Sequence, residues 1–136
     1  MKMIRLFLFL LICCILSGCC GPKEAIKGFC GISTKVLEDK RKDAVARDFS
    51  LDFDTTRTKI REVLTKEGSY IYSEDLSLNL IAVFVSGTDA TPVGIFLTAL
   101  DVDNTRVEIS SPSTYGKEII AKNIFGALKG TLNEKK

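Results

Sequence analysis

Polar and apolar residues alternate over residues 48–53, and this two-residue period is typical of a half-buried β-strand. Apolar residues then recur at helical spacing over residues 55–66, where Asp54 can cap the helix and Gly68 can end it. A second helical pattern covers residues 117–133. Between the two helices, alternating or continuously apolar segments predict four strands, at residues 69–73, 76–86, 93–102 and 105–110.

The predicted order is one strand, one helix, four strands and one helix. Short turns between successive strands favour an antiparallel meander, and two amphipathic helices can cover its apolar face. The sequence therefore predicts an α+β fold, a two-layer sandwich in which a mostly antiparallel five-stranded sheet carries two helices on one face. The first strand can pair with the fifth, which gives the order 2-3-4-5-1 that we expect, or in parallel with the second through a right-handed crossover. This domain would span residues 48–132, with a tail at 133–136.

An apolar run at residues 6–16 follows the basic residues Lys2 and Arg5. At about 1.5 Å per residue it would span about 16 Å as a helix, which is roughly half of a bilayer core. This length is typical of the central region of a secretory signal and too short for a stable membrane-spanning helix. We expect residues 1–18 to be a signal peptide that is removed.

The signal ends in Leu16-Ser17-Gly18-Cys19, which resembles the lipobox of bacterial lipoproteins. The resemblance implies that the thiol of Cys19 receives a diacylglycerol, that the chain is cut before it, and that the new amino group is acylated, for example with palmitate. Two or more acyl chains anchor a protein stably to a membrane. The residue after Cys19 is Cys20 rather than Asp, which by resemblance favours the outer membrane, inner leaflet, facing the periplasm if the source is Gram-negative. With a single membrane, the protein would lie on its outer face.

Residues 19–47 are expected to hold the lipidated Cys19, a Gly-containing tether and a charged helix over residues 35–46. That helix has a thin apolar stripe, so it either lies solvated against the domain or binds a partner. Cys20 and Cys30 are a possible disulfide in a compartment that tolerates one. Acylation, or pairing with another chain, are the alternatives.

The chain of 136 residues contains no His, which excludes a Ser-His-Asp triad, a Cys-His pair and a His-ligated metal. The formal net charge is +2, but removal of Lys2 and Arg5 with the signal would leave 17 basic and 17 acidic residues. A neutral mature protein gives no reason to expect a nucleic-acid partner. We expect no metal and no cofactor.

Three segments contain polar side chains that could in principle bind a ligand. Asp101 and Asp103 lie at a strand end, but the segment lacks the remaining ligands of a calcium loop, so a solvated hairpin is expected. The hydroxyl-rich segment 111–116 precedes the last helix and is expected to cap it rather than to bind an anion. Tyr70 and Tyr72 share a strand face and are expected to be ordinary sheet residues.

The strand at 105–110, followed by a turn and a helix that begins Lys117-Glu118-Ile119-Ile120, resembles the end of a family of small bacterial lipoproteins of unknown function. The resemblance covers the signal and about residues 48–132, and it assigns no catalytic residues. It implies the fold and the location but no mechanism.

Two functions are compatible with these features. The first is a membrane-anchored, non-catalytic lipoprotein whose periplasm-facing domain interacts with another envelope protein or supports envelope assembly. The alternative is a carrier of a lipid or other apolar small molecule, which needs unfilled space between the helices and strand residues such as Leu78, Leu80, Ile95 and Leu97. No enzymatic activity is expected from a chain without His. Lys and Tyr residues such as Lys117 and Tyr115 would be the remaining candidates for acid or base.

Overall fold

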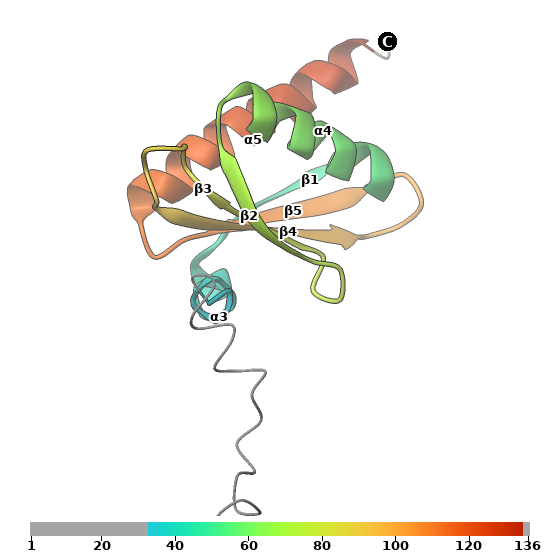
Figure 1. The fold of residues 1–136 in the computed structure, drawn as a ribbon. Helices are drawn as coiled ribbons and strands as arrows, with labels where there is room; N and C mark the ends of the chain where they lie inside the picture. The colour runs from blue at the N-terminus through green and yellow to red at the C-terminus, as the bar shows by residue number, and fades with distance from the viewer. Residues whose placement is uncertain (1–32, 135–136) are drawn as a thin grey trace, which may run out of the picture. The chain divides into compact units, whose positions relative to one another are not determined.

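The computed structural model describes residues 33–134, and one compact unit of the chain begins at Ser33 (Figure 1). The signal peptide, the lipobox, Cys20 and Cys30 lie outside the described residues. The elements in chain order are helix α3 (Lys35–Asp39), the short 3₁₀ helix η1 (Arg41–Asp43), β1 (Val45–Phe49), α4 (Phe53–Lys66), β2 (Tyr70–Asp75), β3 (Leu80–Phe84), β4 (Pro92–Ala99), β5 (Thr105–Ser110) and α5 (Thr114–Glu134). Within residues 33–134, no helix is both long enough and apolar enough to cross a membrane.

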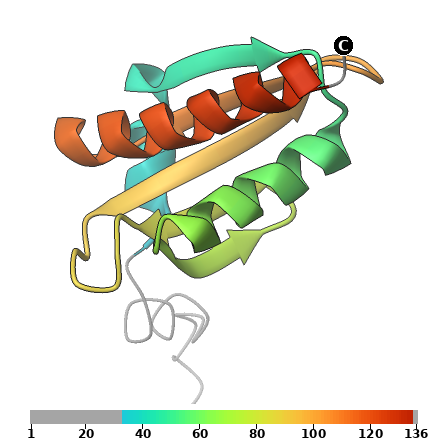
Figure 2. The ribbon, with the colours of Figure 1, turned by 90° about the horizontal axis from the view of Figure 1, so that it is seen from above.

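The five strands form one sheet in the order β1-β5-β4-β3-β2, with every neighbouring pair antiparallel. This is the expected order 2-3-4-5-1 read from the other edge, so the predicted α+β sandwich is confirmed. Helices α4 and α5 lie side by side on one face of the sheet, and β1 is the edge strand next to α5 (Figure 2). The parallel pairing of the first two strands is therefore wrong.

The main core fills the layer between the sheet and the two long helices. Helix α5 contributes Ile120, Ile124 and Leu128, which follow one another at helical spacing and are all buried. Helix α4 contributes Ile60 and Leu64 in the same way. The strand residues that face them are Phe49, Ile81, Val83, Val93, Ile95, Leu97, Val107 and Ile109, and Val85 follows directly after β3. Alternation along each strand places these side chains on one face.

Both ends of α4 are fixed by local hydrogen bonds. The helix begins two residues earlier than expected, at Phe53, because the side chain of Asp52, not Asp54, accepts a hydrogen bond of 2.8 Å from the amide of Thr55. At the other end, Gly68 has a φ of 76°, and the amide of Ser69 donates to the carbonyl of Leu64 at 2.9 Å. This is the Schellman arrangement, in which a left-handed residue is needed, so Gly68 ends the helix as predicted.

A second, smaller core lies on the opposite face of the sheet, where α3 is placed. Its buried residues are Leu37, Leu80, Ala82 and Phe96, with Tyr72 packed against them. The hydroxyl of Ser110 donates to the carbonyl of Leu37 at 2.8 Å, which ties α3 to β5. The sheet therefore has apolar partners on both faces, although α3 covers only part of one.

The N-terminal boundaries differ from the prediction. The helix expected over residues 35–46 ends at Asp39, and β1 occupies residues 45–49 instead of 48–53. Residue 48 therefore lies inside β1, which pairs with β5 from Val45 opposite Ile109 to Phe49 opposite Thr105. The reason is tertiary: the backbone bonds and packing gained beside β5 outweigh the helical preference of a charged segment.

The long strand expected over residues 76–86 is also shorter. Leu76 and Leu78 lie in a turn between β2 and β3, and both are exposed. The carboxylate of Asp75 accepts a hydrogen bond of 2.8 Å from the amide of Ser77, and Asn79 has a positive φ of 49°. An Asp that bonds the backbone two residues on, followed by Asn in the left-handed region, is turn chemistry that overrides the apolar alternation.

Candidate functional site

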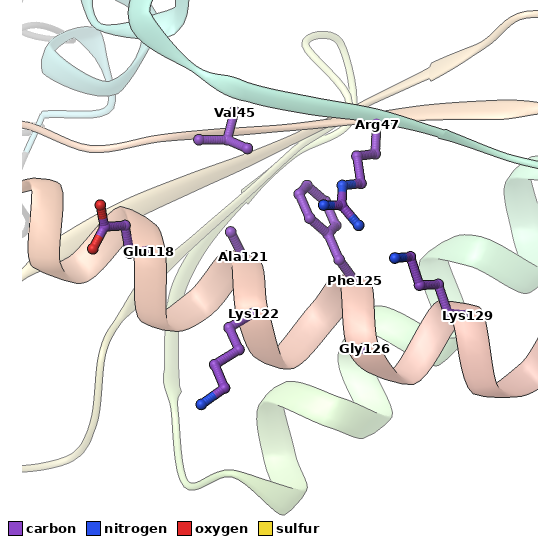
Figure 3. Close-up of a pocket in the computed structure, with 8 residues that line it drawn as sticks. All are labelled: Val45, Arg47, Glu118, Ala121, Lys122, Phe125, Gly126 and Lys129. Carbon is purple, nitrogen blue, oxygen red and sulfur yellow. The ribbon is translucent and has the colours of Figure 1, made fainter.

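A surface groove lies between the edge strand β1 and helix α5 (Figure 3). Its volume is about 410 Å³. The residues that line this β1–α5 groove are Val45 and Arg47 of β1 and Glu118, Ala121, Lys122, Phe125, Gly126 and Lys129 of α5. Both walls are regular elements, so the groove is held by the packing of the fold.

The floor of the β1–α5 groove is apolar. Val45 and Arg47 are two residues apart on β1 and therefore point to the same side of the sheet, toward α5. Ala121 and Phe125 are one helical turn apart on α5 and face them. The ring of Phe125 also contacts Phe49 of the main core, with centroids 5.6 Å apart. The floor is thus an outward continuation of the core.

The rim of the groove is mainly basic. It carries three cations, Arg47, Lys122 and Lys129, and one carboxylate, Glu118. The guanidinium of Arg47 lies over the ring of Phe125, 5.2 Å from its centroid, in a cation–π contact. In Figure 3, Arg47 and Lys129 point toward the same end of the groove, beside Phe125, whereas Lys122 points away.

These rim cations lack counter-ions within the described part of the chain. The ion pairs found there join Arg41 with Glu108, Arg57 and Arg61 with Glu74, Lys59 with Glu62, and Arg106 with Asp48. Arg47 and Lys129 belong to none of them. The convergence of two unpaired cations over an apolar floor makes this end of the groove suited to an anionic group attached to an apolar one.

Strand β1 leaves one backbone edge open beside the groove. Its only strand neighbour among the described residues is β5, and the first four of its five residues are exposed. No other backbone hydrogen bond of the described residues involves residues 45–49. Unpaired strand edges are templates for the addition of another strand.

The acidic hairpin at the end of β4 is held by hydrogen bonds among its own residues. The carboxylate of Asp101 accepts hydrogen bonds of 2.9 Å from the side-chain amide of Asn104 and from the backbone amide of Asp103. These bonds, that of Asn104 first, hold the pKa of Asp101 below its ordinary value. Within residues 33–134 no group of three or more His, Cys, Asp or Glu side chains could hold a metal ion. Residues 101–103 are exposed between β4 and β5, as expected of a solvated hairpin.

The segment 111–116 caps the last helix, as expected. The hydroxyl of Ser113 accepts a hydrogen bond of 3.2 Å from the amide of Gly116, and the carbonyl of Ser113 accepts from the amide of Lys117 at 3.0 Å. The Lys117 ammonium donates to the carbonyl of Asp43 at 2.8 Å, while Tyr115 is exposed. The structure does not bring these two side chains together in a shared site.

Tyr70 and Tyr72 both stack on Phe84 of β3, with centroid distances of 6.2 Å and 4.4 Å. An irregularity in the β2–β3 register falls at Tyr72. The hydroxyl of Tyr72 is buried and is the one such side-chain oxygen or nitrogen in the described residues without a hydrogen-bond partner. Burial raises the pKa of Tyr72 above its ordinary value. The pair packs as part of the sheet, with one unsatisfied polar atom.

We expect Tyr72→Phe to raise the free energy of unfolding by about 1 kcal/mol, because the change removes a buried hydroxyl that makes no hydrogen bond. Urea denaturation of the two proteins measures the difference. Tyr70→Phe is the matched control and should have little effect, since the side chain of Tyr70 is 57% exposed. A loss of stability in Tyr72→Phe would show that the hydroxyl has a partner.

Sequence reasoning missed the β1–α5 groove, because its two walls lie about 70 positions apart in the chain. The prediction of β1 at residues 48–53 also excluded Val45 and Arg47 from the sheet. Of the candidates taken from the sequence, none lines the groove. Neither a family profile nor a curated protein matches this chain.

Proposed function

We propose that this protein is a lipid-anchored envelope protein whose non-catalytic domain binds another protein through β1 and the adjoining groove. The observation that carries the proposal is the open edge of β1, which lies directly beside an apolar floor with a basic rim. Protein interfaces combine such an apolar centre with a polar rim. The signal and the lipobox of the sequence support the location.

The alternative, a carrier of an apolar small molecule, has less support in the arrangement of the core. Ile95 and Leu97, which were expected to line its cavity, are buried against α4 and α5. Leu80 lies in the second core on the other face of the sheet, and Leu78 lies in the β2–β3 turn. Space for a small ligand is instead found in the β1–α5 groove, whose apolar floor is the one feature that favours this alternative.

The proposed contact is tested by a photo-crosslinking amino acid at Val45 in the full chain, expressed in its native membrane. We expect Val45 to yield a crosslinked protein of defined mass. A second chain, with the crosslinker at the exposed residue Thr58 on α4, is the control and should yield only background. Recovery of lipid but no protein from Val45 would favour the carrier, and equal products from both positions would contradict a specific interface.

The proposed anchor is tested by Cys19→Ser. Because only a thiol can receive the diacylglycerol, this change should abolish the lipidated mature form and leave the signal uncut by the lipoprotein peptidase. Mass spectrometry of the N-terminal peptide and membrane fractionation measure the outcome. Cys20→Ser is the matched control and should remain lipidated. An unmodified N-terminus at another residue in the unaltered protein would contradict the anchor.

The non-catalytic part of the proposal is tested by turnover of esters, peptides, glycans and phosphates. Turnover that survives repurification and is lost in Tyr115→Phe or Lys117→Met would contradict it.

A further inference from the structure

The unpaired cations at one end of the β1–α5 groove restrict what can pair with β1. A charged side chain on the inner face of an edge strand is one of the ways in which proteins prevent a foreign strand from adding. Arg47 has this position: it projects over the floor of the groove beside Phe125. An added strand that placed an apolar or basic residue opposite Arg47 would bury or repel the guanidinium. An acidic residue there would form a favourable cross-strand pair.

The pattern of β1 fixes the spacing of the partner. Val45 and Arg47 face the groove, while Ala46 and Asp48 face the other side of the sheet. Asp48 is already paired with Arg106 of β5, with 2.7 Å between the Asp48 carboxylate and the guanidinium Nε. The groove side thus offers one apolar position and one basic position, two residues apart.

Resting on the proposed function, we propose that the partner contributes an extended segment that adds to the open edge of β1, with an acidic side chain opposite Arg47 and an apolar side chain opposite Val45. The carboxylate lies at the end of the groove to which both Arg47 and Lys129 point. The apolar side chain covers Ala121 and Phe125. Backbone hydrogen bonds to β1 supply affinity, and the acidic residue supplies selectivity.

The test uses the full lipidated chain in nanodiscs of phosphatidylcholine and two labelled peptide probes. The Val/Glu peptide repeats Thr-Val-Thr-Glu, so that one strand face carries Val and Glu two residues apart, and the Val/Lys peptide has Lys in place of each Glu. We expect the Val/Glu peptide to bind and to slow hydrogen exchange at the amides of residues 45–49. Arg47→Glu should weaken its binding about tenfold, less so at high salt, and should favour the Val/Lys peptide. Lys129→Glu should act in the same direction. Lys66→Glu is the matched control, because Lys66 is an exposed lysine of α4 that does not line the groove, and it should leave binding unchanged.

Equal affinity for the two peptides, or binding without slowed exchange in β1, would overturn the proposal. Binding of dodecanoate with an affinity that depends on Arg47, without binding of the Val/Glu peptide, would overturn it in favour of an amphiphilic anion. The proposed function fails separately, when Val45 crosslinks to no protein in the native membrane. If Val45 does crosslink to a protein but the peptide is not bound, the function stands and the acidic extended segment does not.

Discussion

Leu37→Ala should lower the free energy of unfolding by about 2–5 kcal/mol, although the residue lies in a charged segment of only five helical residues. The side chain is 0% exposed and packs between α3 and the sheet against Leu80, Ala82 and Phe96. Its truncation leaves a cavity that the sheet cannot close, since the strands are fixed by their ladders. Urea denaturation of a fragment of residues 33–136 measures the change.

Val36→Ala is the matched control, because Val36 is the neighbouring residue of α3 and is 42% exposed. Its effect should stay within about 0.5 kcal/mol, as for ordinary surface substitutions. Equal effects of the two changes would show that α3 does not dock on the sheet through Leu37.

Ile124→Ala should lower the free energy of unfolding by about 2–5 kcal/mol as well. Ile124 is 0% exposed at the middle of the α5 stripe, between Ile120 and Leu128, and it lies in the main core. Thermal or urea unfolding of the same fragment measures the change in the free energy of unfolding. Leu80→Ala, which leaves a cavity in the second core, should lower it by an amount in the same range.

Lys122→Ala serves as the control for α5, because Lys122 is exposed on the same helix and Ala is a good helix former. We expect its effect to stay near zero. Near-neutral results at both Ile124 and Leu80 would mean that the buried faces of the helix and of the sheet are misassigned.

Local patterns in the sequence predict most of the sheet and both long helices. The bounds of β5 agree with the prediction at both ends, because Val107 and Ile109 alternate with charged residues between a tight turn and a proline. The strand order followed from short connections and from the absence of any need for a crossover. The capping of α5 by Ser113 could be predicted for the same reason, since it depends only on neighbouring residues.

The parts that were missed depend on contacts between distant residues. Leu37 stands almost alone among charged residues, so no period marks it as buried. It fits because Gly94 of β4 has no side chain: a Cβ there would lie 3.0 Å from that of Leu37. One signal was present, since apolar residues on both faces of β3, such as Leu80 and Ile81, indicate a strand covered on both sides. The groove left no local signal, because β1 and α5 meet only in the folded chain.

The docking of α3 also decides how the domain responds to tension. A pull from the N-terminal side enters the compact unit at Ser33 and meets α3 before any strand. The packing of Leu37 and the hydrogen bond from Ser110 to its carbonyl bear the load first. Helix α3 must therefore detach before the force reaches the sheet. Once α3 has detached, the force reaches Val45, the first residue of the β1–β5 ladder, and β1 separates from β5 one residue at a time. While α3 stays docked, β1 bears no load and remains in register with β5.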